Sequence, residues 1–138
     1  MKPFYLISVL CLLVLVSCKQ GASYQKPDDP LEAGRDFIRF ALDGDMKMAK
    51  SFLLSNADND RLFDKIEKVY KDASPADKEQ YKQASIIINK VEKVDDSTTV
   101  INFSNSFRKK NQDLKMVKTK GEWWVDFKYT FTGIQPVE

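Results

Sequence analysis

The apolar residues of this chain change their spacing once, at about Ser85, and this change divides the chain into two kinds of secondary structure. From residue 30 to residue 84 they recur every three or four positions, a period typical of amphipathic helices. From Ser85 onward they alternate with polar residues, and β-branched and aromatic types dominate, as in half-buried strands. Helices followed by strands predict an α+β fold, in which N-terminal helices pack on one face of an antiparallel sheet.

The first helix is the most clearly marked element. Asp29 suits the N-cap, Pro30 suits the first helical position, and Glu32 stands where it would complete a capping box. Gly44 is expected to end this helix. Gly34 lies within the apolar stripe, where glycine costs about 1 kcal/mol relative to alanine, so we expect another element to approach the helix closely there.

Three further helices and four strands complete the expected domain. The helices begin at Asp45, at about Asp60 and at Ser74, and the last of them ends near Ala84. The strands are expected at residues 85–94, 98–108, 112–119 and 122–132, with a tight hairpin at Lys120-Gly121. Three consecutive isoleucines in the first strand indicate a β-bulge or burial of both faces.

Charge and composition exclude several classes of function. The 138 residues include 22 basic and 20 acidic side chains, and the charges are interspersed except in a basic hairpin around Lys109 and Lys110. A nucleic-acid partner is not expected, because a protein that binds the phosphate backbone needs a basic face. We interpret the hairpin as a solvated turn that discourages edge pairing, in preference to a contact with anionic lipid. The length allows one domain.

The chain lacks histidine, and its two cysteines are Cys11 and Cys18. Histidine is the commonest general base near neutral pH and a common metal ligand. If Cys11 leaves with a signal peptide and Cys18 is modified, no thiol remains for a disulfide or a metal site. The sequence therefore predicts no metal site, no cofactor and no catalytic residue.

The N-terminus has the layout of a secretory signal. Lys2 supplies a positive charge, residues 4–16 are uncharged and apolar, and Ser17 is small. The apolar stretch is shorter than the roughly 20 residues that a membrane-spanning helix needs. We therefore expect residues 1–17 to be a signal peptide that is removed.

The end of this segment, Leu15-Val16-Ser17-Cys18, resembles the lipobox of bacterial lipoproteins. The resemblance implies that the Cys18 thiol receives a diacylglyceryl group and that the signal is cleaved just before it. Two or more acyl chains then hold a protein firmly on a membrane. The alternative is an ordinary secretory signal with an incidental cysteine.

The same resemblance implies a location and a layout. Lys19, a non-acidic residue after the cysteine, is similar to lipoprotein sorting patterns that favour the outer membrane of the bacterial cell envelope. Residues 18–28 are small and polar and are expected to be the lipidated cysteine and a flexible tether. Residues 29–138 are expected to be the single α+β domain.

Two short segments add to the element order. Residues 29–38 read DPLEAGRDFI and precede a Gly44-Asp45 step between two helices, and residues 121–125 read GEWWV after a hairpin. Together they resemble small lipoprotein families of the nuclear transport factor 2-like superfamily. The resemblance implies a cystatin-like cone, in which helices cover a curved four-stranded meander, and homodimers through the sheet. Some members of the superfamily are isomerases, dehydratases or cyclases that work inside the cone.

The predicted strands place a few polar residues on the apolar face of the sheet. Asn105 and Tyr129 are candidates for the polar end of a small-ligand pocket lined by Trp123, Phe103 and Phe107. The alternative is that both are core polar groups with hydrogen-bond partners.

The predicted apolar faces carry no carboxylate. Asp126 and Tyr129 stand three apart on the last predicted strand and are expected to point to opposite faces, which excludes them as an acid–base pair. Trp124 is expected on the outer face, where it either contacts a partner or is covered by the tail of the chain.

Three hypotheses for function follow. The leading one is a non-enzymatic, membrane-tethered envelope domain that binds a small molecule, a peptide or a protein. The second is an isomerase-like or dehydratase-like enzyme that uses the cone, which the missing histidine and the missing inward acid disfavour. The third is a protein-interaction module centred on Trp124. A cavity of roughly several hundred Å³ would favour the first two over the third.

Overall fold

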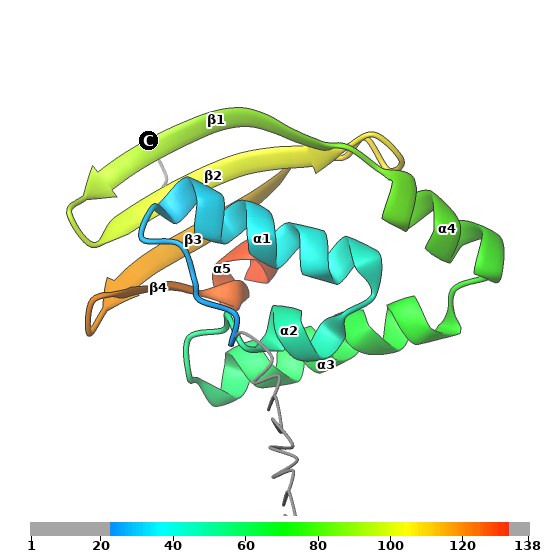
Figure 1. Ribbon diagram of the computed structural model, residues 1–138, viewed down its shortest axis with the longest axis horizontal. Coiled ribbons are helices and arrows are strands. Elements are labelled where there is room, and N and C mark those ends of the chain that lie inside the picture. The colour runs from blue at the N-terminus through cyan, green and yellow to red at the C-terminus, as the bar shows by residue number, and fades with distance from the viewer. Residues whose placement is uncertain (1–22, 133–138) are drawn as a thin grey trace, which may run out of the picture.

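The structure, a computed structural model, describes residues 23–132 of the chain. Its elements are, in order, α1 (Pro30–Asp43), α2 (Met46–Lys50), α3 (Ala57–Asp72), α4 (Pro75–Gln83), β1 (Ile86–Asp95), β2 (Thr98–Asn105), β3 (Gln112–Thr119), β4 (Glu122–Val125) and α5 (Phe127–Thr132). The fold is α+β, with helices before a four-stranded antiparallel sheet as expected (Figure 1). The expected signal peptide and Cys18 lie outside the described residues.

The ends of α1 follow the predicted N-cap and C-terminal residues, but Glu32 lies 4.0 Å from Arg35 and no capping-box hydrogen bond joins it to Asp29 among the described residues. The Asp29 carboxylate accepts hydrogen bonds from the backbone N–H groups of Leu31, at 2.9 Å, and Glu32, at 3.0 Å. Gly44 follows the last turn with φ of 80°. The aspartate satisfies backbone donors that lack a partner within the helix, and glycine takes the left-handed conformation at little cost. Local sequence is sufficient to place this helix.

Gly34 marks the closest approach between α1 and the sheet. A Cβ atom at this position would lie 2.7 Å from Cδ1 of Ile101 on β2 and 3.3 Å from Cδ2 of Leu114 on β3. The helix contacts all four strands. The close approach predicted from this glycine is therefore confirmed, and it sets the spacing between the helical layer and the sheet.

α3 begins at Ala57, earlier than predicted, because Asn56 caps it through a hydrogen bond to the backbone two residues on. Asn59, in the first turn of α3, is fully buried. Its amide nitrogen donates to the carbonyl of Leu54 at 3.0 Å, and its side-chain oxygen accepts from the N–H of Lys128 at 2.8 Å. One buried side chain thus joins α3 to α5.

The sheet is a meander of order β1-β2-β3-β4. The register between β1 and β2 shifts between Ile88 and Lys90, so the expected bulge in the isoleucine-rich strand is confirmed. A bulge of this kind changes which face the following side chains occupy. Lys120 and Gly121 have φ of 51° and 80°, which is the geometry of the tight hairpin predicted between β3 and β4.

The last expected strand, residues 122–132, is wrong beyond Val125. β4 ends there, and α5 begins at Phe127. The N–H of Tyr129 donates to the carbonyl of Asp126 at 3.2 Å, which starts the helical turn. The backbone of this segment therefore pairs locally, and the alternation of aromatic and polar residues in it does not belong to a strand.

Phe127 shows why tertiary packing overrides that alternation. Its buried ring lies 5.5 Å from the ring of Phe63 on α3 and 6.1 Å from the ring of Phe37 on α1, centroid to centroid. Aromatic residues favour strands mainly because they pack well on a half-buried surface, and here a helical turn buries the ring better. The hydrogen bond from Lys128 to Asn59 holds that turn in place.

β2 also ends early, at Asn105. The side-chain oxygen of Asn105 accepts hydrogen bonds from the N–H groups of Phe107, at 3.1 Å, and Arg108, at 2.9 Å. Lys109 follows with φ of 54°. An asparagine that bonds the backbone two and three residues on favours a turn over a continued strand. The connection between β2 and β3 is therefore a defined turn.

The segment of residues 24–28, which we call the N-terminal strap, lies against the domain. Tyr24 donates a hydrogen bond to Asp36 on α1. Lys26 Nζ lies 3.3 Å from the ring centroid of Trp124, and the indole N–H of Trp123 donates to the carbonyl of Asp28 at 2.9 Å. From the sequence, these residues are expected to belong to a flexible tether. In the structure they are held by aromatic and polar contacts instead, so a tether could only precede them.

The hydrophobic core fills the space between the helices and the sheet. Its fully or almost fully buried side chains are Ala33, Phe37, Ile38, Leu42, Met46, Ala49, Phe52, Leu53, Phe63, Ile101, Phe103, Leu114, Met116, Trp123, Val125 and Phe127. Within residues 23–132, each helix is too short or too polar to cross a bilayer.

Candidate functional site

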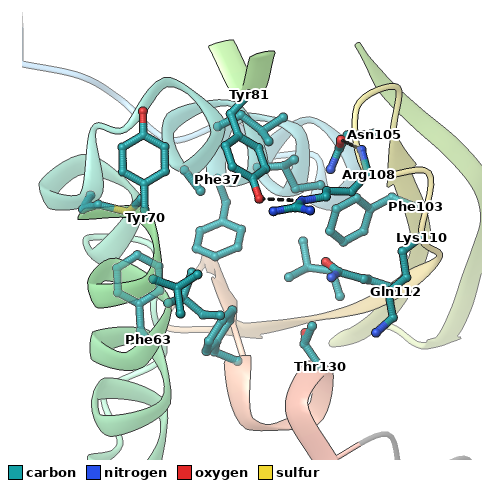
Figure 2. A pocket seen from close by; sticks show the side chains of 18 residues that line it. Phe37, Phe63, Tyr70, Tyr81, Phe103, Asn105, Arg108, Lys110, Gln112 and Thr130 are labelled. Carbon is teal, nitrogen blue, oxygen red and sulfur yellow. Dashed lines mark hydrogen bonds between the residues drawn. The ribbon is translucent and has the colours of Figure 1, made fainter. Parts of the chain in front are cut away.

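A cavity of about 640 Å³ lies beside this core (Figure 2). It is bordered by all five helices, α1 to α5, by β2 and β3, and by the turn that joins these two strands. Its lining residues are Phe37, Ile38, Ala41, Leu42, Met46, Phe63, Ile66, Val69, Tyr70, Tyr81, Phe103, Asn105, Arg108, Lys110, Gln112, Leu114, Phe127 and Thr130. The volume falls within the range of about 300–1,000 Å³ typical of small-molecule sites.

Most of the wall is apolar. α1 contributes Phe37 and Leu42, α3 contributes Phe63 and Ile66, and α5 contributes Phe127. The same aromatic side chains belong to the core, so the rings that contact one another also form the floor of the cavity. This part of the site can exclude water from an apolar guest.

Four polar lining residues, two of them cationic, gather on one wall. Asn105, Arg108, Lys110 and Gln112 come from the end of β2, the following turn and the start of β3. Figure 2 shows them on the side opposite to Phe63 and Tyr70. The cavity therefore has an apolar side formed by helices and a polar, cationic side formed by the sheet.

Arg108 is positioned by its neighbours. Its Nε donates a 2.8 Å hydrogen bond to the hydroxyl of Tyr81 on α4, and the guanidinium carbon lies 5.5 Å and 5.1 Å from the ring centroids of Tyr81 and Phe107. The hydrogen bond to Tyr81 raises the pKa of Arg108 above its usual value. The asparagine turn at Asn105 fixes the backbone of Arg108 through a hydrogen bond to its N–H. The guanidinium is thus charged and held at the edge of the cavity.

Two further features describe the electrostatics of the cavity. Over residues 23–132 the lining carries two cations, Arg108 and Lys110, and no carboxylate. Thr130 on α5 has a buried hydroxyl without a hydrogen-bond partner among the described residues.

Of the five pocket residues proposed from the sequence, two line the cavity and three do not. Phe103 and Asn105 line the cavity, whereas Trp123, Phe107 and Tyr129 are not among its described lining residues. Trp123 is in the core next to the strap, and Phe107 packs edge-on against Tyr81, with centroids 5.0 Å apart. Tyr129 lies on α5 near Lys115, whose Nζ is 5.6 Å from its ring centroid. The error for Tyr129 follows from the strand that was predicted in place of α5.

Asp126 requires a correction. The strand predicted here places Asp126 on the outer face, yet it is 6% exposed, and its Oδ2 lies 3.6 Å from Nζ of Lys115. Lys115 also approaches Tyr129, so the helical turn brings Asp126 and Tyr129 close to the same lysine. The prediction that Asp126 and Tyr129 point to opposite faces of a strand is therefore wrong. The cluster is separate from the described lining of the cavity, and we interpret it as a structural ion pair between a buried carboxylate and a partly exposed lysine.

Trp124 is half-buried, and the N-terminal strap covers it. Its indole nitrogen is buried and has no hydrogen-bond partner among residues 23–132. Of the two roles considered for Trp124, the structure favours a covered ring, and the covering segment precedes the domain.

Sequence reasoning missed the cationic wall. Lys110 was interpreted as part of a solvated hairpin, and Arg108 was placed at the end of a strand. The available signal was Asn105, because an asparagine at a strand end followed by several cations favours a turn that presents them together. Tyr81, which holds Arg108, could not be paired with it from sequence, since the two are far apart along the chain.

Comparisons of the chain with protein-family models, curated proteins and solved structures found no match. The resemblance to the nuclear transport factor 2-like superfamily therefore remains an expectation from the sequence pattern.

Proposed function

We propose that this protein is a membrane-tethered, non-enzymatic lipoprotein of the bacterial cell envelope, on the outer membrane, whose domain binds a small molecule in the cavity. The observation that carries the proposal is the cavity of about 640 Å³ with apolar walls on one side and a positioned cationic wall on the other. Such a combination of apolar surface and a few placed polar groups is characteristic of ligand sites. The tether is supported by the lipobox-like end of the N-terminal segment at Cys18.

An enzyme in the same cavity is the alternative, and the titratable groups in the described lining argue against it. They are Tyr70, Tyr81, Arg108 and Lys110. Burial, with added repulsion from Asp43 and Glu79, raises the pKa of Tyr70, so this hydroxyl keeps its proton near neutral pH. Arg108 also keeps its proton. These groups suit the holding of a guest better than the abstraction of a proton from it.

A second class of partner is favoured by one observation, the exposed apolar side chains of the edge strand β1. Ile87, Val91 and Val94 are each more than two-fifths exposed. Edge strands with such side chains can pair with another chain. A homodimer through the sheet, or an envelope protein bound there, would therefore use β1 and not the covered Trp124. Sedimentation of the protein at several concentrations would show whether it dimerises.

The anchor is tested by the mass of the protein extracted from bacterial membranes. We expect the measured chain to begin at Cys18 and to carry a diacylglyceryl group, and we expect Cys18→Ala to remain uncleaved and without lipid. Intact Met1 on an unmodified wild-type chain would contradict the tether.

The cavity is tested by what co-purifies with the chain. Native mass spectrometry of the full chain, followed by solvent extraction, is expected to show a bound small molecule. Ala41 lines the cavity on α1, so Ala41→Phe should displace that molecule. Ala57, which is exposed at the start of α3, gives the matched control Ala57→Phe, and occupancy should be unchanged in it. Equal occupancy in the two variants would contradict a role for the cavity.

A further inference from the structure

We propose that the guest of this cavity is an anionic single-chain amphiphile, a fatty-acid-like carboxylate, whose head is bound by Arg108 and Lys110 and whose chain lies along the apolar wall. This inference rests on the small-molecule function proposed above and names the chemical class of the ligand. It is carried by the separation of charge and apolar surface within one cavity.

The cationic wall is prepared for a carboxylate. The guanidinium of Arg108 uses Nε to bond Tyr81, and its two Nη groups have no hydrogen-bond partner among the described residues. Figure 2 shows the guanidinium reaching from this wall toward Tyr81. A planar guanidinium can bind a carboxylate through two parallel hydrogen bonds, and an arginine that is already fixed loses less entropy on binding. Lys110 adds a second positive charge on the same wall.

The charges in the cavity lining favour one orientation of the bound amphiphile. Carboxylates outside the lining lie near both walls, since Asp43 and Glu79 act on Tyr70 and Asp77 acts on Arg108. Within the described lining the charged side chains are Arg108 and Lys110, so an anionic head would be attracted to their wall. A cationic head would be repelled from this wall, and a neutral head would have no electrostatic preference for it.

The apolar wall is suited to the alkyl chain of the amphiphile. Phe37, Leu42, Phe63, Ile66 and Phe127 form a continuous part of the lining, contributed by three helices. An alkyl chain has no polar atoms that would need partners there, so its contacts remove only apolar surface from water. The head and the chain of one amphiphile thus match the two sides of the cavity.

Photo-crosslinking of the full chain in its membrane tests the proposal. Two probes that share one alkyl diazirine chain are compared, a dodecanoic acid and the corresponding dodecanol. We expect the acid to label peptides of α1, α3 and α5 at least tenfold more than the alcohol. Arg108→Gln with Lys110→Gln should lower labelling by the acid about tenfold and leave labelling by the alcohol within twofold.

Two further variants control for loss of charge elsewhere on the protein and for loss of folding. Arg61 and Lys65 are exposed cations on α3 outside the described lining, so Arg61→Gln with Lys65→Gln removes the same charge and should leave labelling by both probes unchanged. If the double variant of Arg108 and Lys110 loses its circular-dichroism signal, Lys110→Gln alone, at an exposed position, is expected to lower labelling by the acid severalfold.

Other results of the labelling experiment would overturn either the anionic head or the whole proposal. Equal labelling of the cavity peptides by both probes would overturn the anionic head and leave the small-molecule function standing. Absence of cavity labelling by either probe, together with an empty cavity in native mass spectrometry, would overturn both. A variant truncated after Thr132 gives the last comparison. If this variant is labelled and the full-length protein is not, the polypeptide after Thr132 fills the cavity, and the amphiphile proposal is overturned.

Discussion

The side chains of Tyr81 and Arg108, 27 positions apart in the chain, are joined by a 2.8 Å hydrogen bond from Nε of the arginine to the tyrosine hydroxyl. This bond links α4 to the turn between β2 and β3, and it holds the guanidinium at the edge of the cavity. Through it, a short and polar helix with no buried residue contributes to the candidate site.

Tyr81→Phe removes the hydroxyl and keeps the ring. A single hydrogen bond of this kind contributes about 1 kcal/mol, so we expect labelling by the carboxylate probe to weaken about fivefold while thermal stability changes little. Tyr70→Phe is the matched control, because it removes a hydroxyl from the neighbouring ring, 6.0 Å from that of Tyr81 between centroids, without touching the hydrogen bond that holds Arg108. A larger loss in the Tyr70 variant would place the head on the other wall.

Asn59→Ala is expected to destabilise the fold strongly. It would leave the carbonyl of Leu54 and the N–H of Lys128 without their buried partner. Each such group costs about 1–3 kcal/mol, so the free energy of unfolding should fall by about 3 kcal/mol in urea titrations. Gln80→Ala, at an exposed position on α4, should change it by less than about 0.5 kcal/mol. Similar values for the two variants would contradict the role of Asn59 in anchoring α5.

Gly34→Ala tests the contact between α1 and the sheet. The new methyl group would lie 2.7 Å from Cδ1 of Ile101, and overpacking of this kind costs about 1–3 kcal/mol. Ile101→Val removes that Cδ1 atom and alone should cost about 1 kcal/mol. We expect the double variant to be more stable than the sum of the two losses implies, as a double-mutant cycle would show. Simple additivity would mean that the helix shifts freely.

Tyr24 makes the docking of the N-terminal strap depend on pH. Burial and the hydrogen bond to Asp36 raise the pKa of Tyr24 above its usual value near 10. Because the folded state favours the protonated hydroxyl, this stabilisation is complete below pH of about 10 and is lost as the pH rises further. Unfolding measured between pH of about 8 and 11 should show a steeper loss for the wild type than for Tyr24→Phe. Parallel curves would indicate that the strap does not bind through this hydroxyl.

Asp126→Asn tests whether the ion pair with Lys115 is structural. Removal of one charge leaves Lys115 without its partner, and because Lys115 is partly exposed we expect a loss of about 2 kcal/mol in unfolding free energy. Glu92→Gln breaks an exposed pair with Lys90 and should cost less than about 0.5 kcal/mol. Occupancy of the cavity by its small molecule should persist in the Asp126 variant. Loss of the ligand without loss of stability would assign Asp126 to the site.

Local chemistry accounts for the parts of the fold that sequence reasoning predicted well. The start of α1 depends on Asp29 and the backbone of its first turn, and the hairpin before β4 depends on Lys120 and Gly121 taking positive φ. These signals act between residues that are close in the chain. For that reason they survive in any tertiary context, and the bulge in β1 could be predicted in the same way.

α5 and the cavity needed more than local chemistry. Period-2 alternation predicted a strand through Phe127, but burial of its ring between α1 and α3 and the bond from Lys128 to Asn59 favour a helix. Likewise, the aromatic pocket residues were chosen by strand face, and a changed element moved Tyr129 away from the cavity. Contacts with residues far away in the sequence therefore outweighed the strand propensity of this segment, which is about 1 kcal/mol.

The order of helices and strands, the caps and turns that bound them, and the resemblance of the N-terminus to a lipoprotein signal all follow from neighbouring residues and can be recognised in the printed chain. The position of Arg108 against Tyr81, the burial of Asp126 and the docking of the strap on Trp124 depend on residues brought together from separate segments. Such contacts exist only after the chain has folded, because their free energy comes from packing and desolvation between surfaces that are far apart in the sequence.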